Sequence, residues 1–389
     1  MPQPMMIHPG FADVIDRFDD SIRQRLSSQG HQVLNHIQAC RTSLLGGRLL
    51  HCNACQKHYV QYHSCRDRHC PVCGYQASQD WVDARMQDVL PVTYHHLVFT
   101  LPHELNPWVT RYRAVIYRLL FQAAWATLKT FAENPKRLNG QLGAMLMLHT
   151  WGQTLTRHVH VHCLVPGGAL QADGQWRSAP ATYLFPVRAL SRYYRGKMVA
   201  SLRKARKELA GFDDDHIDEV LDKLMSQDWV VYSKPVISQT NTVVEYLARY
   251  TKRIGLTNAR LLKMDEAHVW LRYKNYRQDG RHQVMKLKGE ELLRRFLLHL
   301  LPRGFMRVRY YGYLANVHRR KKLNKIRSAI DHATTKRIQQ LKKMAAEPPR
   351  PARYQARCIT CQQIMVMIRE IPAVPWSYLH RQVFAHGIN

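Results

Sequence analysis

The sequence predicts an α+β protein in which helices cover an antiparallel sheet. Segments 94–102, 143–152 and 158–165 are rich in apolar and β-branched residues, as strands are. A short link joins the last two, so they should pair antiparallel. Between the first two, residues 108–132 repeat apolar side chains at helical spacing and predict a long helix.

The elements around this sheet are predicted in the same way. Residues 11–40 have helical spacing and form a helical lead-in that ends near Gly46. After the central strands, the patterns predict helices at 186–208, 214–226 and 241–254, a strand at 229–236, a hairpin at 268–287, a helix over ELLRRFLLHLLP and a strand over MRVRYYGYLA.

Cysteine pairs mark a metal site near the N-terminus. Cys52 and Cys55 form one Cys-x2-Cys knuckle, and Cys70 and Cys73 form another after 14 intervening residues. Four thiolates at this spacing predict one closed, tetrahedral, structural Zn²⁺ site. Cys65 lies in the same stretch with four histidines, which leaves an exchanged ligand or a second metal open; these are His51, His58, His63 and His69.

The C-terminal pair Cys358 and Cys361 is half a site by the same reasoning. It either borrows His380 or His386 or binds nothing. The composition and patterns divide the chain into residues 1–92 (helical and zinc-binding), 93–317 (the sheet and its helices) and 318–389 (a basic tail).

Charge indicates the partner. The net charge of +30 exceeds what solubility requires and favours a polyanion, with nucleic acid ahead of an anionic membrane surface. The start lacks a signal-peptide pattern and no 18-residue apolar run exists, so we expect no membrane contact and a cytoplasmic protein. The expected DNA contacts are Arg66, Arg68, Lys252, Arg253, Arg272, Lys274, Arg277, Arg319, Arg320, Lys321 and Lys322.

Three histidines alternate with valines in HVHVHCLVPGG. On a strand, His158, His160 and His162 point to one face, where they can hold a divalent ion, while Val159 and Val161 fill the other face. Satisfied core histidines are the alternative. Imidazole does not select magnesium, so we expect either Mg²⁺ or Mn²⁺.

Two tyrosines lie one turn apart on the helix predicted at 241–254. Tyr246 and Tyr250 share a face, with Lys252 and Arg253 just beyond them. An ordinary apolar stripe explains the pair equally well unless a metal is near. Beside a metal, a phenol can attack a phosphodiester and keep the phosphoryl group as a covalent intermediate.

The chain resembles the two-tyrosine HUH transposases of rolling-circle bacterial insertion sequences, the insertion sequence ninety-one group. The motifs occur in order: CNAC with SCRDRHCPVC, VFTLP, HVHVHCLVPGG, EYLARYTKRIGLTNARL, YKNYR and LLRRFLLHLLPRGFMRVRYYGYLAN. The resemblance implies an HUH-type sheet, in which a histidine, a hydrophobic residue and a histidine hold the metal. Val159 stands where members commonly have proline, so the HUH pair is either His158 with His160 or His160 with His162.

The resemblance also implies a transposase that cleaves and rejoins single-stranded DNA at the element's ends and target. Tyr246 and Tyr250 take the catalytic roles, no nucleotide cofactor is needed, and the protein works at the bacterial nucleoid. Self-association stays open. Two alternatives remain: a replication initiator or relaxase with the same chemistry, and a non-catalytic, zinc-dependent DNA-binding regulator.

Overall fold

The computed structural model describes residues 9–73, 85, 88–236, 255–330 and 356–374. The helix expected at 241–254, with Tyr246, Tyr250, Lys252 and Arg253, lies outside these residues. The chain forms two compact units. The first unit contains residues 1–77, 252–297 and 346–389, and the second contains residues 78–251 and 298–345. Among the described helices, none has the length and apolar character needed to cross a bilayer.

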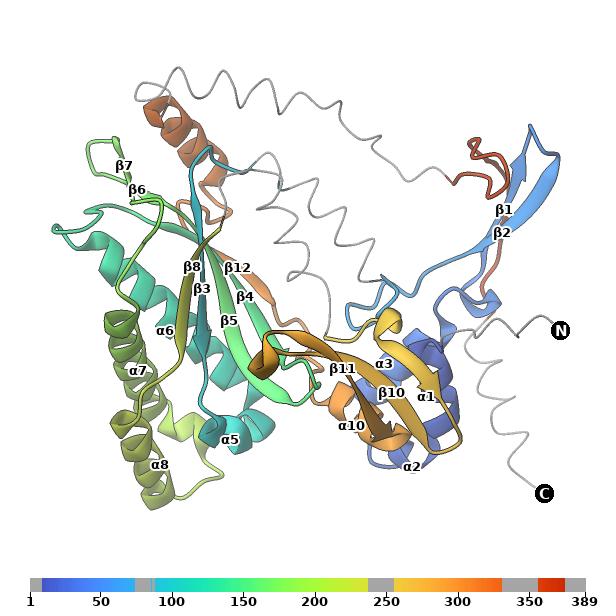
Figure 1. Cartoon of the computed structure of the whole chain (residues 1–389), viewed down its shortest axis with the longest axis horizontal. Helices are drawn as coiled ribbons and strands as arrows, with labels where there is room; N and C mark the ends of the chain where they lie inside the picture. The colour runs from blue at the N-terminus through green and yellow to red at the C-terminus, as the bar shows by residue number, and fades with distance from the viewer. Residues whose placement is uncertain (1–8, 74–84, 86–87, 237–254, 331–355, 375–389) are drawn as a thin grey trace. The chain divides into compact units, whose positions relative to one another are not determined.

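The second unit is built on a five-stranded sheet with the order β12-β4-β5-β3-β8. Every neighbouring pair in it is antiparallel, which confirms the predicted fold class. Figure 1 shows this sheet beside the long helices of the same unit. The strands are β3 (Tyr94–Thr100), β4 (Gly143–Trp151), β5 (Arg157–Pro166), β8 (Val231–Val236) and β12 (Val308–Gly312).

The two faces of this sheet are chemically different. Val159, Val161 and Cys163 of β5 point into the main apolar core, which also holds buried side chains of the helices. His160 and His162 alternate with them and therefore lie on the opposite face. The helices of the unit are α5 (Asn106–Arg111), α6 (Arg113–Glu133), α7 (Val187–Lys204) and α8 (Asp214–Ser226), and a small hairpin is formed by β6 (Gly168–Leu170) and β7 (Trp176–Ser178).

The segment expected to open a basic tail is part of the second unit. Residues 319–330 are helical. Leu323, Ile326 and Ile330 are buried in a cluster with Leu90 and Tyr313. The apolar spacing of this helix holds it to the unit, so the basic residues around it are fixed in place.

The first unit joins segments that are distant in the sequence. Helices α1 (Phe11–Phe18), α2 (Asp20–Arg23) and α3 (Ser28–Ala39) form the expected lead-in. α10 (Gly289–Leu297) packs against α1, with the rings of Phe11 and Phe296 4.5 Å apart. A three-stranded sheet, β11-β10-β9, belongs to the same unit and contains the expected hairpin. Its strands are β9 (Leu261–Met264), β10 (His268–Asn275) and β11 (Arg281–Lys288).

A second sheet of the first unit has the order β13-β1-β2. Its strands are β1 (Gly47–Cys52), β2 (Lys57–Tyr62) and β13 (Val366–Ile371). Figure 1 shows the C-terminal strand, in red, running along the blue β1 and β2. The two units do not coincide with the expected divisions at residues 92 and 317. Residues 252–297 belong to the first unit, and so does β13, which pairs with β1 across more than 300 positions.

Candidate functional site

Three histidines of the second unit converge on the face of the sheet opposite the main apolar core. His149 of β4 is the registered partner of His160 on β5. The ring nitrogens of His149, His160 and His162 lie within 4.8 Å of one another, and all three residues are buried. His158 lies outside this cluster, and its ring is half-buried between those of His103 and His160.

Hydrogen bonds fix the two rings of β5. His160 Nδ1 is 2.9 Å from the carbonyl oxygen of His158, to which it donates, so its Nε2 carries a lone pair. His162 Nδ1 is 2.8 Å from Nε2 of His96 on β3. The two Nε2 atoms of His160 and His162 then face each other at 3.0 Å. Both rings are thus held by their far nitrogens, as metal-binding histidines commonly are.

Burial keeps these rings neutral. It lowers the pKa of His160 to about 3, with the neighbouring His158 as the next cause. Burial also lowers the pKa of His96 to about 4 and that of His162 well below its usual value. At neutral pH the imidazoles therefore offer lone pairs and need lose no proton to bind a cation.

The cluster fits a divalent ion. Two nitrogens bound at about 2.1 Å to one ion at a right angle lie about 3.0 Å apart, which is the distance between the Nε2 atoms of His160 and His162. Three nitrogen donors favour Mn²⁺ or a softer ion over Mg²⁺. His149 was not predicted as a metal ligand from the sequence, although the segment that contains it was predicted as a neighbouring strand.

Cysteines of the first unit form a cluster of four: Cys40, Cys65, Cys70 and Cys73. Cys73 Sγ lies 3.5 Å from the sulfurs of both Cys40 and Cys65. Four sulfurs around a zinc ion at about 2.3 Å are about 3.8 Å apart, so the cluster fits a closed tetrahedral site. Hydrogen bonding from Cys65 lowers the pKa of Cys40 to about 7, which favours the thiolate that zinc requires.

The expected set of Cys52, Cys55, Cys70 and Cys73 is therefore wrong in its grouping. Cys52 and Cys55 lie instead with Cys358 and Cys361. The reason is the intervening strand β2, which pairs with β1 along its whole length. Because the first knuckle is at the tip of this hairpin, the chain returns to its base before it reaches Cys65.

An acidic side chain braces the loop between Cys65 and Cys70. Asp67 accepts hydrogen bonds from the rings of His36 and His69, each at 3.0 Å. Burial raises the pKa of Asp67, but the bonds from His69 and His36 outweigh burial and bring the pKa to about 2. Asp67, which lies between Arg66 and Arg68, therefore fixes the loop that carries these two arginines.

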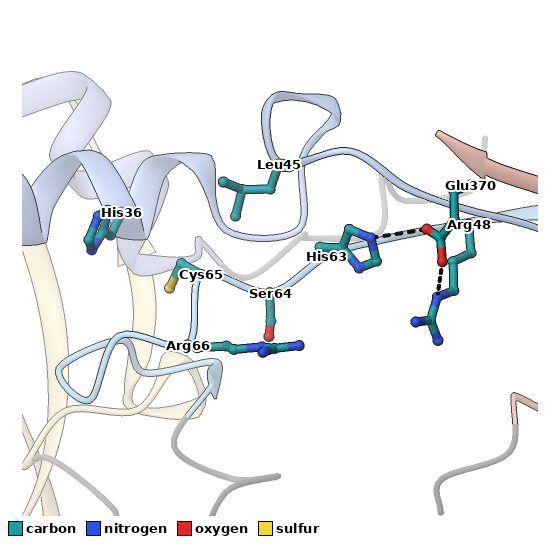
Figure 2. A pocket seen from close by; sticks show the side chains of 8 residues that line it. All are labelled: His36, Leu45, Arg48, His63, Ser64, Cys65, Arg66 and Glu370. Atoms are coloured by element: carbon teal, nitrogen blue, oxygen red, sulfur yellow. Dashed lines mark hydrogen bonds and ion pairs between the residues drawn. The ribbon is translucent and has the colours of Figure 1, made fainter. Parts of the chain in front are cut away.

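A pocket of about 470 Å³ opens beside this loop. Figure 2 shows Arg48 and His63 joined to Glu370, and Arg66 lying next to Ser64. Arg66 is exposed and makes no ion pair with any described residue, so its guanidinium can meet a phosphate. Arg68 is exposed on the same loop.

The sheet β11-β10-β9 presents a basic outer face. Trp270 of β10 is flanked by Lys263 of β9 and Lys286 of β11, whose ammonium groups lie 5.0 and 5.1 Å from its ring. The predicted contacts Arg272 and Lys274 are exposed on the same strand as Trp270. None of the three strands contains an acidic residue. An aromatic ring among cations is suited to a single strand, because bases stack while phosphates meet the charges.

The other predicted DNA contacts differ in their surroundings. Arg319 lies 3.3 Å from Asp88 and over the ring of Tyr310, so it is used within the unit. Lys322 donates to the side chain of Gln141 at 2.7 Å. Arg320 and Lys321 are exposed. The backbone of Arg277 lies in the turn between β10 and β11.

Cysteine clusters in one unit and a histidine cluster in the other define a protein with several groups of side chains that could hold metal ions, and its charge matches that of a nucleic-acid partner. Comparisons with known proteins agree. A family model described as "Putative transposase" matches residues 143–322, which contain the histidine cluster. A model described as "Transposase zinc-binding domain" matches residues 11–101, which contain Cys40, Cys65, Cys70 and Cys73.

Two known proteins are similar along most of the chain. "Putative transposase y4qJ" of Sinorhizobium fredii (strain NBRC 101917 / NGR234) is 38% identical over 335 residues, which cover 83% of this chain and 84% of that protein. "Transposase for insertion sequence element IS801" of Pseudomonas savastanoi pv. phaseolicola is 27% identical over 358 residues, which cover 86% and 82%. No solved structure matches.

The chain belongs to the IS91 family of transposases, the insertion sequence ninety-one group, and has its N-terminal zinc-binding domain. This confirms the family that the motifs predicted. The family makes it a DNA-processing enzyme, and the zinc-binding domain together with the cysteine clusters supports structural Zn²⁺.

Proposed function

We propose that this transposase cuts and rejoins single-stranded DNA at the ends of its insertion sequence through a 5′-phosphotyrosine. The histidine cluster carries the proposal. His149, His160 and His162 converge on the face of the sheet opposite the main apolar core, inside the segment that the transposase model matches. Tyr246 and Tyr250 are the proposed nucleophiles.

His149, His160 and His162 hold the proposed divalent ion, and His96 supports His162 from behind. Such an ion, when bound, withdraws charge from the scissile phosphate and holds it for in-line attack. In this assignment His160 and His162 form the HUH pair, while His158 contributes its carbonyl oxygen to His160. We expect stronger activity with Mn²⁺ than with Mg²⁺, since the protein donors are nitrogens.

The chemical step balances without a nucleotide. The phenol oxygen of Tyr246 or Tyr250 loses its proton and attacks the phosphorus, the bond to the 3′ oxygen breaks, and this oxygen takes up a proton. The phosphoryl group stays on the tyrosine with the 5′ side of the strand. Because the new phosphodiester keeps the bond's energy, a 3′ hydroxyl can later reverse the reaction and join two strands.

The outer face of β9, β10 and β11 supports single-stranded DNA as the substrate. Trp270 offers a stacking surface, while Lys263 and Lys286 beside it offer charge. Duplex DNA hides the faces of its bases in the stack, so only an unpaired strand can use both contributions of this face.

The test uses the full chain and labelled single-stranded oligonucleotides that carry the ends of its insertion sequence. We expect a covalent protein–DNA adduct with Mn²⁺ that is absent with chelator, and peptide mass spectrometry should place the phosphate on Tyr246 or Tyr250. Tyr246→Phe/Tyr250→Phe should bind the oligonucleotide with unchanged affinity and form no adduct.

Tyr273→Phe is the matched control, because it also removes a phenol near basic side chains and should leave adduct formation intact. Adducts that persist in the double tyrosine variant would overturn the proposed nucleophiles. Tight binding with no adduct under any of Mg²⁺, Mn²⁺, Co²⁺ or Zn²⁺ would replace the proposal with a DNA-binding role without cleavage.

A further inference from the structure

The structure contains a second cluster of four cysteines, formed by Cys52, Cys55, Cys358 and Cys361. The first cluster lies entirely within the segment matched by the zinc-binding model, whereas this one takes two of its cysteines from the other end of the chain. Its two knuckles have the same backbone geometry. Gln56 follows Cys55 with φ 54°, and its N–H donates to the carbonyl oxygen of Cys52 at 2.8 Å. Gln362 follows Cys361 with φ 61°, and its N–H donates to the carbonyl oxygen of Cys358 at 2.9 Å. Each knuckle therefore turns back sharply after its second cysteine and directs two sulfurs to the same side.

The four sulfurs converge. All lie within 4.8 Å of one another, and those of Cys52 and Cys361 are 3.5 Å apart. Cys52 and Cys358 are fully buried, so two ligands are closed to water. Four thiolates and no free position describe a structural site, since a catalytic zinc keeps one position open.

The surrounding sheet has little else to hold it together. Every residue of β13 is exposed or half-exposed, including Val366, Met367 and Ile368 at about half of their full area. In β2 only Tyr59 is less than exposed. A sheet with so little buried apolar surface needs another source of stability, and small modules of this kind commonly use a metal.

We propose that Cys52, Cys55, Cys358 and Cys361 bind a second structural zinc ion, which fastens the C-terminal strand β13 to β1. Two hairpin-like turns, each with one knuckle, then share the sheet β13-β1-β2 in the manner of a zinc ribbon. The clip closes a loop of about 300 residues, the kind of cross-link that removes most chain entropy. This site is independent of the proposed cleavage chemistry.

Zinc content of the purified full chain tests the proposal. His160→Ala serves as the background, because it disables the histidine cluster as a third place for zinc. In this background we expect two zinc ions per chain, measured by elemental mass spectrometry against protein concentration. Cys358→Ser/Cys361→Ser should hold one, and so should Cys40→Ser/Cys65→Ser. Ile359→Ser, an exposed neighbour in the same knuckle, should keep both.

Hydrogen exchange measures which strands lose amide protection when the second zinc ion is lost. In Cys358→Ser/Cys361→Ser, the amides of β13 and β1 should lose protection, while those of β4 and β5 in the other unit should not. Cys361→His, which restores a ligand, should recover the second ion, and its Co²⁺ form should show a blue-shifted sulfur-to-metal band. This variant keeps the proposal testable where the double serine variant fails to fold.

Two results would overturn the proposal. One is a chain that holds one zinc ion both with and without Cys358 and Cys361. The other is a disulfide between Cys52 and Cys361 in the protein as purified, detected by alkylation and peptide mapping, with no second zinc after reduction and dialysis against Zn²⁺.

Discussion

Nε2 of His96 lies 2.8 Å from Nδ1 of His162, and the two rings stack with an angle of 14° between their planes. The residues come from the neighbouring strands β3 and β5 and share the face of the sheet opposite the main apolar core. His96 is not part of the three-histidine cluster. Its geometry is that of a partner that orients a ligand ring from the side away from the metal.

His96→Leu should therefore weaken metal binding without removing a ligand. We expect the dissociation constant for Mn²⁺ to rise by about 10 to 100-fold, as for other changes behind a ligand. Calorimetric titration of the metal-free protein measures this. His95→Leu is the matched control, because His95 is the adjacent residue and its side chain lies on the other face. An equal loss in both variants would assign the effect to the strand and not to the hydrogen bond.

His158→Ala should leave metal affinity within about threefold of the parent, whereas His160→Ala should abolish adduct formation. The reason is that His158 supports His160 through its backbone carbonyl oxygen, which the substitution keeps. The adduct assay with Mn²⁺ compares the two variants directly. Complete loss of adduct in His158→Ala would instead place His158 in the HUH pair.

Acid should destabilise the second unit through His95. Burial lowers the pKa of this histidine from 6.5 to about 4, and neither ring nitrogen has a hydrogen-bond partner among the described residues. Between pH 6.5 and 4 the unfolded chain binds more protons than the folded chain, so the free energy of unfolding falls as the pH falls through this window. The contribution, present in full above pH 6.5, is at most about 3 kcal/mol.

Urea unfolding followed by tryptophan fluorescence at pH 7 and pH 5 measures this slope. The unfolding midpoint of His95→Leu should change less between the two pH values than that of the parent. An unchanged slope would mean that other buried histidines, such as His299, account for the acid sensitivity.

Two kinds of substitution should separate stacking from charge on the sheet β11-β10-β9. Trp270→Ala should cost about 1 to 3 kcal/mol in single-strand affinity and leave its salt dependence unchanged. Lys263→Gln/Lys286→Gln should reduce the slope of log affinity against log salt by about 1.4, or 0.7 for each lost phosphate contact. Fluorescence anisotropy with a labelled oligonucleotide measures both, with Lys223→Gln on α8 as the control. Equal salt slopes in all variants would exclude this face from DNA binding.

The five-stranded sheet and the long helices of the second unit were predictable because their burial repeats along the chain, whereas helix 319–330 was hidden among basic residues. β3, β4, β5 and β8 all lie where alternation or apolar runs placed them. The sheet β13-β1-β2 was not predicted, because its outward side chains are mixed and the partner of β1 is more than 300 positions away. No local pattern in a sequence records a pairing at that distance.

The site residues were likewise predictable where a local pattern places them and not where long-range pairing does. His160 and His162 were predicted because one strand places both of them. His149 could have been predicted by pairing the two strands on either side of the short link as a hairpin, because this places His149 opposite His160. The grouping of the cysteines could not be found in this way, since it depends on a hairpin that separates Cys55 from Cys65 and on a strand from the other end of the chain.

The pairing of β1 with β13 has a consequence for synthesis on the ribosome. The hairpin of β1 and β2 leaves the exit tunnel early, but its partner strand is translated more than 300 residues later. At about 5 to 20 residues per second, this leaves one edge of β1 open for roughly 15 to 60 seconds. The N-terminal sheet is thus among the first parts of the protein to be made and among the last to be finished.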